Sequence, residues 1–225
     1  GDRVAVSGKN SPEWAIAYLA ILYTGATVVP LDYQLKDEEI DFLLTFAGVQ
    51  YLFIDAERIN DIDSKGTVGL LEKISLETGH TDYIFGKTAD KAPKRKAATE
   101  KDLAAILFTS GTTGNPKGVM LTHANLVSDC YLAQDLMTLY PTDIFYALLP
   151  IHHSYTMLAV FIEAISVGAE RVFGKKLIVS QILKELTRGN VTMFLAVPML
   201  FNKMLKGLVN GIKEKGYVVS GMIKF

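Results

Sequence analysis

One segment constrains the fold of this 225-residue chain more than any other: an apolar run at residues 103–108 leads directly into the polar sequence TSGTTGNPKG at residues 109–118. Six consecutive apolar residues are typical of a strand that is buried on both faces of a parallel sheet. In open α/β sheets, ligands lie beyond the carboxyl ends of such strands. The two segments together therefore predict a central strand that leads into a ligand-binding loop.

The rest of the chain alternates between strand patterns and helix patterns. Strands are expected at residues 3–7, 27–29, 50–54, 119–121, 144–149, 170–173 and 191–196. Helices are expected at residues 12–24, 36–47, 123–138, 154–167, 177–188 and 198–204. This alternation predicts an α/β fold of layered, mostly parallel sheets flanked by helices.

Residues 86–102, GKTADKAPKRKAATEKD, interrupt this alternation. The segment holds six lysines or arginines and almost no large apolar side chain. Such a charge run is more typical of a solvated surface connection than of a binding patch. We therefore place the best internal boundary of the chain there, within a single partial domain that spans residues 1–225.

Composition narrows the classes of protein. A hydrophobic fraction of 49% with a net charge of −1 excludes intrinsic disorder, and the near-neutral charge argues against a dedicated nucleic-acid binder. Cys130 is the single cysteine, so no internal disulfide framework is expected and a reducing, cytoplasmic location is favoured. No stretch of about 20 mostly apolar residues is present, so no transmembrane segment is expected; peripheral contact with a membrane stays open.

The loop at residues 109–118 combines four hydroxyl side chains, three glycines and one lysine. Glycines let backbone N–H groups approach an anion closely, and hydroxyls can bind a hard cation such as Mg²⁺. These properties suit a polyphosphate. The loop is not a Walker A sequence, because Pro116 precedes Lys117 and Gly118 follows it. By composition alone, it fits a flexible linker equally well.

The order of residues 109–123, TSGTTGNPKGVMLTH, closely resembles the signature of the adenylate-forming superfamily. That superfamily comprises acyl- and aryl-CoA synthetases, firefly-type luciferases and the adenylation domains of peptide synthetases. Supporting similarity lies in GDRVAV at 1–6, in residues 19–32, in LPIHH at 149–153 and in FLAVPMLFNKML at 194–205. The resemblance implies that ATP activates a carboxylic acid as an acyl-adenylate, which then forms a thioester with coenzyme A.

The resemblance also implies roles for particular residues. The β- and γ-phosphates of ATP would be held by Thr109, Ser110, Gly111, Thr112, Thr113, Gly114 and Lys117. Thr112 would also lie near Mg²⁺, and Lys117 and His153 would act in catalysis. His152 is expected to be structural. Because neighbouring side chains of an extended segment point to opposite faces, we do not expect His152 and His153 to share a metal ion.

The identity of the acid is less constrained. The His-His block followed by SYTM is similar to bacterial long-chain fatty-acid enzymes, which favours a fatty acid. An aryl-CoA ligase, a peptide-synthetase adenylation domain and a non-catalytic nucleotide-binding module remain as alternatives.

Several parts of the superfamily pattern are not found in the sequence. They are the Tyr-Gly-x-Thr-Glu segment, the Thr-Gly-Asp of the ribose site, the hinge and the small C-terminal domain with its catalytic lysine. We therefore expect an incomplete large N-terminal domain, which needs the remainder of its own chain as a partner and is inactive alone.

Overall fold

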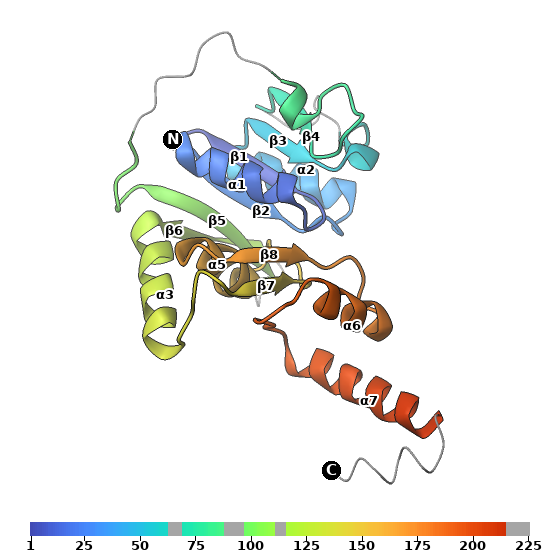
Figure 1. Ribbon diagram of the computed structural model, residues 1–225. Helices are drawn as coiled ribbons and strands as arrows, with labels where there is room; N and C mark the ends of the chain where they lie inside the picture. The colour runs from blue at the N-terminus through green and yellow to red at the C-terminus, as the bar shows by residue number, and fades with distance from the viewer. Residues whose placement is uncertain (63–68, 88–96, 111–115, 215–225) are drawn as a thin grey trace.

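The computed structural model describes residues 1–62, 69–87, 97–110 and 116–214. Within them, an α/β fold is built on a six-stranded sheet and a two-stranded sheet (Figure 1). The strands are β1 (Arg3–Ser7), β2 (Thr27–Leu31), β3 (Tyr51–Ile54), β4 (Glu72–Ser75), β5 (Leu103–Ser110), β6 (Pro116–Thr122), β7 (Ile144–Ala147) and β8 (Glu170–Phe173). The larger sheet has the order β4-β3-β1-β2-β5-β6, and β7 pairs with β8 in the smaller one.

Helices connect and cover the strands. They are α1 (Pro12–Tyr23), α2 (Asp37–Ala47), α3 (His123–Leu136), α4 (Ser154–Thr156), α5 (Glu163–Ser166), α6 (Val179–Arg188) and α7 (Pro198–Glu214), with a π-helical segment at Met157–Ile162 and short 3₁₀ turns at Ala56–Arg58 and Ile84–Gly86. The local sequence determines where several of these helices begin or end. The Ser11 hydroxyl accepts from the Trp14 N–H at 3.1 Å at the start of α1. Gly48, with φ of 63°, ends α2 in the left-handed conformation.

The predicted fold class is confirmed. Within the larger sheet, β1 to β5 all run parallel, and β6 alone returns antiparallel to β5. The carboxyl ends of five strands therefore meet at one edge. The pairing of β2 with β5 joins the chain before and after the basic segment in one sheet. Residues 88–96 of that segment lie outside the described residues, and a domain boundary there stays a prediction.

Several local expectations differ from the structure. The helix expected at 198–204 continues to Glu214, the strand expected at 144–149 ends at Ala147, and the helix expected at 154–167 is π-helical over Met157–Ile162. Residues 191–196 do not form a strand: Met193 makes one isolated bridge to Phe145, with its N–H donating to the Ile144 carbonyl at 3.1 Å. The predicted strand at 27–29 continues to Leu31, through Pro30. Strand β4 was not predicted, because its sequence EKIS is short and carries little apolar pattern.

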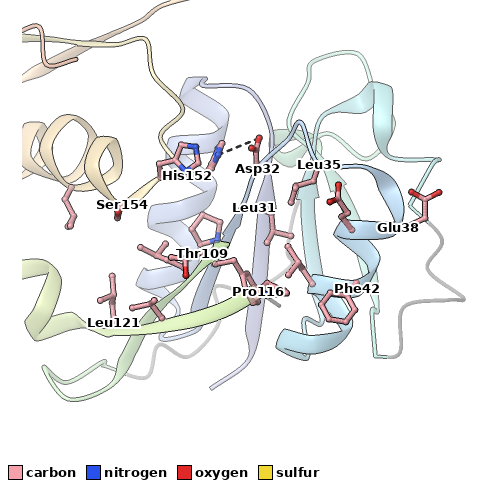
Figure 2. A pocket seen from close by; sticks show the side chains of 18 residues that line it. Leu31, Asp32, Leu35, Glu38, Phe42, Thr109, Pro116, Leu121, His152 and Ser154 are labelled. Atoms are coloured by element: carbon pink, nitrogen blue, oxygen red, sulfur yellow. Dashed lines mark ion pairs between the residues drawn. The ribbon is translucent and has the colours of Figure 1, made fainter. Parts of the chain in front are cut away.

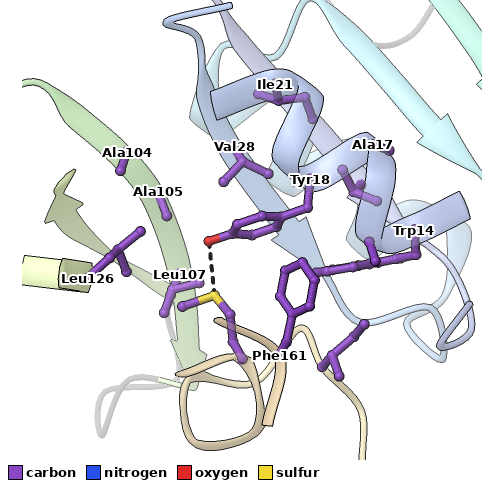
Figure 3. Packing of buried hydrophobic residues seen from close by; sticks show 14 of the residues in the cluster. Trp14, Ala17, Tyr18, Ile21, Val28, Ala104, Ala105, Leu107, Leu126 and Phe161 are labelled. Atoms are coloured by element: carbon purple, nitrogen blue, oxygen red, sulfur yellow. Dashed lines mark hydrogen bonds between the residues drawn. The ribbon is translucent and has the colours of Figure 1, made fainter. Parts of the chain in front are cut away.

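Aromatic side chains join the two sheets. Trp14 and Tyr18 stack on α1 with ring centroids 5.3 Å apart, and both meet Phe161 of the π-helical segment edge-on, at 5.7 Å and 5.2 Å. The Tyr18 hydroxyl donates to the sulfur of Met157 at 3.2 Å (Figure 3). All three rings are fully buried, so this cluster fixes the position of the 152–162 region against the larger sheet. No helix in the described part of the chain is both long and apolar enough to cross a membrane.

Candidate functional site

The described part of the signature sequence lies at the end of β5 and along β6, which pair antiparallel. Thr109 pairs with Lys117, and Ser110 pairs with Pro116, so both ends of the loop reach the carboxyl edge of the sheet together. Four of the predicted phosphate-binding residues lie outside the described residues: Gly111, Thr112, Thr113 and Gly114. The hairpin geometry nevertheless brings the two ends of the predicted phosphate loop side by side.

Thr109 and Lys117 are exposed on the hairpin. Lys117 forms no ion pair with any residue that the structure describes. An ammonium group without a carboxylate partner is available to an anionic ligand. The fit with a polyphosphate therefore rests on Lys117 and the Thr109 hydroxyl, and the Mg²⁺ role of Thr112 is left as a prediction.

The hairpin opens on a cavity of about 860 Å³. Segments far apart in the sequence build it: the end of β2, one face of α2, the β5–β6 hairpin and the turn before α4 (Figure 2). The apolar lining residues are Pro30, Leu31, Leu35, Phe42, Leu43, Leu107, Phe108, Pro116, Val119, Leu121 and Leu158, and the polar ones are Asp32, Glu38, Glu39, Thr109, His152, His153 and Ser154. A mostly apolar cavity with a few polar groups at the ends of parallel strands is typical of a small-molecule site.

The two histidines lie in a turn that lines the cavity. The His153 N–H donates to the Pro150 carbonyl at 3.3 Å, and the Thr156 hydroxyl donates to that same carbonyl. This turn replaces the extended segment that the sequence suggested. As a result, the rings of His152 and His153 lie 4.2 Å apart between centroids, and the expectation that they point to opposite faces is wrong.

Asn10, in the loop between β1 and α1, fixes the approach to this turn. Its amide donates to the carbonyls of Ala147 at 3.1 Å and Leu149 at 2.8 Å, and its carbonyl accepts from the Ile151 N–H at 3.0 Å. Sequence reasoning missed Asn10. The available signal was its position beyond the carboxyl end of the first predicted strand, where polar side chains meet other strand ends.

The two histidines differ in environment. His152 is 7% exposed, whereas His153 is exposed. Burial, and then the charge of His153, lower the pKa of His152 to about 4, against the opposing effect of Asp32. His152 is therefore neutral near pH 7, and its Nε2 lies 3.6 Å from the Asp32 carboxylate.

Asp32 is a second residue that sequence reasoning missed. It follows the buried strand β2, and its carboxylate lies within 4.8 Å of a ring nitrogen of each histidine, as those nitrogens do of one another. The sequence alone did not predict a carboxylate beside the histidine pair. The missing information was the spatial neighbourhood of β2 and the turn.

An α/β protein whose parallel strands end at a mostly apolar cavity fits the class that binds a small molecule at the strand ends. The chain belongs to the AMP-binding enzyme family, whose sequence model matches residues 1–223.

The individual relatives are consistent with the family match. The chain is 30% identical to fatty acyl-CoA synthetase B of Dictyostelium discoideum over 95% of the chain and 34% of that protein. It is also 30% identical to long-chain-fatty-acid–CoA ligase 1 of Cavia porcellus, over 89% of the chain and 32% of that protein. The chain thus spans about a third of the length of these curated relatives.

A solved structure shares the fold. ATP-bound MatB from Rhodopseudomonas palustris superposes with a TM-score of 0.79 at 29% identity, over 91% of this chain and 41% of that one. This similarity supports the fold described above. The relative that shares the fold was solved with ATP bound.

Proposed function

We propose that the chain supplies the phosphate loop and part of the acid-binding cavity of an enzyme that joins a long-chain fatty acid to coenzyme A at the expense of ATP. The observation that carries this proposal is that the β5–β6 hairpin and the His153 turn open on one apolar cavity. A polyphosphate site and an apolar acid site must adjoin for a carboxylate to reach the α-phosphate. The fatty acyl relatives support the choice of acid.

The proposed reaction has two steps. A carboxylate oxygen attacks the α-phosphorus of ATP, the bond to the β-phosphate oxygen breaks, and pyrophosphate leaves. The thiolate of coenzyme A then attacks the acyl carbonyl carbon and AMP leaves with the former carboxylate oxygen. The thiol proton is released to solvent or to a base. The first step turns a poor electrophile into a good one because AMP is a far better leaving group than hydroxide.

In this proposal, the residues of the chain act by position and charge. Lys117 and the hydroxyls and N–H groups of residues 109–114 would bind the β- and γ-phosphates, and Thr112 would hold Mg²⁺, which would supply positive charge against the polyphosphate. His153 orients the carboxylate against the α-phosphate from the other side of the cavity. Such preorganised charge is commonly the largest contribution to transition-state stabilisation.

The cavity supports an apolar acid in particular. Leu31, Phe42, Leu107 and Val119 surround it from four different elements, and its volume of about 860 Å³ is at the upper end for small-molecule sites, which are typically about 300–1,000 Å³. Burial of an alkyl chain stabilises binding by about 0.8 kcal/mol per CH₂. Long acids should therefore be preferred over short ones.

ATP–pyrophosphate exchange in the longest natural protein that contains this sequence tests the proposal. The acid panel comprises acetate, octanoate, palmitate, benzoate and a mixture of amino acids. Exchange that rises from octanoate to palmitate supports it. Exchange driven by benzoate would favour an aryl-CoA ligase, and exchange driven by amino acids a peptide-synthetase adenylation domain. ATP binding without exchange for any acid would favour a non-catalytic module.

The 225-residue chain itself provides a second test. We expect it to bind ATP weakly and to form neither AMP nor acyl-CoA, because the Glu, Asp and second Lys of the superfamily pattern are absent from its sequence. Turnover by the chain alone, measured as AMP release with palmitate and coenzyme A, would contradict this part of the proposal.

A further inference from the structure

The cluster of Asp32, His152 and His153 has a property that acid activation does not require. Its carboxylate oxygen and two ring nitrogens all lie within 4.8 Å of one another. The three residues come from two separate places in the fold, the end of β2 and the turn before α4. They also line the same cavity, so a small ion among them would face its interior.

The buried ring nitrogen of His152 is a second, independent observation that indicates a ligand at this cluster. Its side chain is 5% exposed, and its Nε2 has no hydrogen-bond partner among the residues that the structure describes. Buried polar atoms are normally satisfied, and each exception calls for an explanation. Figure 2 shows the His152 ring directed toward the Asp32 carboxylate, at a distance of 3.6 Å, which is too long for a hydrogen bond.

That distance suits a shared ion. Zn²⁺ binds imidazole nitrogen at about 2.0–2.1 Å and carboxylate oxygen at about 2.0–2.2 Å, so two ligand atoms of a tetrahedral site lie roughly 3.3–3.5 Å apart. The gap between His152 and Asp32 is close to this value. His153 is exposed, and its ligand nitrogen lies within 4.8 Å of the other two ligand atoms.

The ligand types identify the class of ion. Mg²⁺ and Ca²⁺ prefer oxygen ligands only, whereas two imidazoles and one carboxylate are a set that divalent transition metals favour. We propose that Asp32, His152 and His153 bind one divalent transition-metal ion of the Zn²⁺ type, whose remaining coordination position faces the apolar cavity. This site is separate from the Mg²⁺ that the phosphate loop would hold.

Metal titration of the purified natural protein that contains this sequence tests the proposal. After treatment with a chelator, the protein should bind one equivalent of Zn²⁺ in calorimetry. Co²⁺ should give the visible absorption bands of a tetrahedral site with nitrogen and oxygen ligands, and Zn²⁺ should abolish them. An excess of Mg²⁺ should leave these bands unchanged. The absence of stoichiometric Zn²⁺ binding, or displacement of Co²⁺ by Mg²⁺, would overturn the proposal.

Variants locate the site. His153→Ala removes an exposed ligand and should weaken Zn²⁺ binding by about 100-fold or more, above the 10–100-fold typical of a residue that only supports a ligand. The matched control is His80→Ala, because His80 also lies near a carboxylate, that of Asp82 at 3.9 Å, but belongs to no group of three metal-ligating residues in the described part of the chain. Its Zn²⁺ affinity should not change.

Asp32→Asn gives a second, independent loss and leaves the buried His152 in place. Its side chain is 32% exposed, so the substitution should be tolerated, and circular dichroism verifies the fold. Unchanged Zn²⁺ affinity in both His153→Ala and Asp32→Asn, or an equal loss in His80→Ala, would assign the binding elsewhere. These experiments measure metal binding. Their result therefore does not depend on whether the proposed acid activation is correct.

Discussion

The aromatic core beneath α1 and the cavity at the strand ends use similar side chains for different purposes. In the core, Phe161 is 0% exposed and lies edge-on to two other rings. In the cavity, Phe42 is 53% exposed and shares the wall with charged and imidazole groups. Close packing without voids fixes the two sheets against each other, whereas the strand ends leave room for a ligand. The predictions below test this division.

The largest expected effect lies in the core. Phe161→Ala should lower the free energy of unfolding by about 3–5 kcal/mol, because it removes the ring that contacts both Trp14 and Tyr18. Phe42→Ala is the matched control, and its cost should stay below about 1 kcal/mol because its ring is already half exposed. Urea denaturation of both variants checks this. Equal losses would show that the cavity wall is as tightly packed as the core.

The second-largest effect is a loss of activity, and it concerns Lys117 near the cavity. Lys117→Ala should reduce ATP–pyrophosphate exchange in the natural protein that contains this chain by about 10²–10³-fold, as the loss of one preorganised charge typically does. Its thermal unfolding should be unchanged, because Lys117 is exposed. Lys101→Ala, at the opposite end of β5, is the control and should keep full exchange. Retained exchange in Lys117→Ala would remove this lysine from the phosphate site.

Asn10 connects the loop after β1 to the chain that leads into the histidine turn. Asn10→Ala should cost about 1–3 kcal/mol, since it leaves the partly buried carbonyls of Ala147 and Leu149 and the N–H of Ile151 without their partner. Hydrogen exchange at the Ile151 amide should become faster. Asn125→Ala, which alters an exposed helix cap, should leave Ile151 protected. Unchanged exchange at Ile151 in Asn10→Ala would mean that the turn holds its shape unaided.

The smallest effect is a pH dependence beside the sheet. Burial raises the pKa of Asp55 from 3.8 to about 6, with Glu77 and Glu57 adding to the shift and the backbone N–H and charge of Lys9 opposing it. The folded state therefore holds this proton more tightly than the unfolded state does. The charged carboxylate costs stability progressively as pH rises from about 4 to 6.

Asp55→Asn should remove this cost while its amide oxygen still accepts from the Lys9 N–H. We expect the variant to gain about 1 kcal/mol over the natural chain at pH 8, less than the full shift would give because solvent screens part of it. The gain should vanish at pH 4. Urea denaturation at both pH values measures it, and an equal gain at pH 4 would rule out titration as its origin.

Much of the architecture could be predicted because it depends on short stretches of sequence. The apolar run before the signature predicted the strand β5, although β5 lies beside the edge strand β6 and not at the centre of the sheet. Ser11-Pro12 predicted the start of α1. The hairpin that follows β5 was also foreseen as a strand after the loop. Each of these signals lies within a few residues of the element it specifies, so no knowledge of the tertiary fold was needed.

The rest depended on contacts between distant segments. Residues 191–196 have the apolar pattern of a strand, but Met193 alone among them forms a β-bridge within the described part of the chain, and the pattern cannot reveal that. The proximity of Asp32 to the histidine pair requires β2 and the turn before α4 to meet in space. Likewise, the bend that brings His152 and His153 together depends on hydrogen bonds within the turn and on its anchorage by Asn10.

The bond from Asn10 to the Ala147 carbonyl spans 137 residues, and this separation has a consequence for the order of assembly. The entropy of closing a loop grows with its length, so β1, β2 and β3, which adjoin within the first 54 residues, pair at lower cost than the cavity walls. During synthesis, the parallel sheet can begin to form while the histidine turn is still inside the ribosome. The cavity cannot exist before Leu158 emerges, so nascent chains should gain protease resistance in the sheet before they gain any ligand affinity.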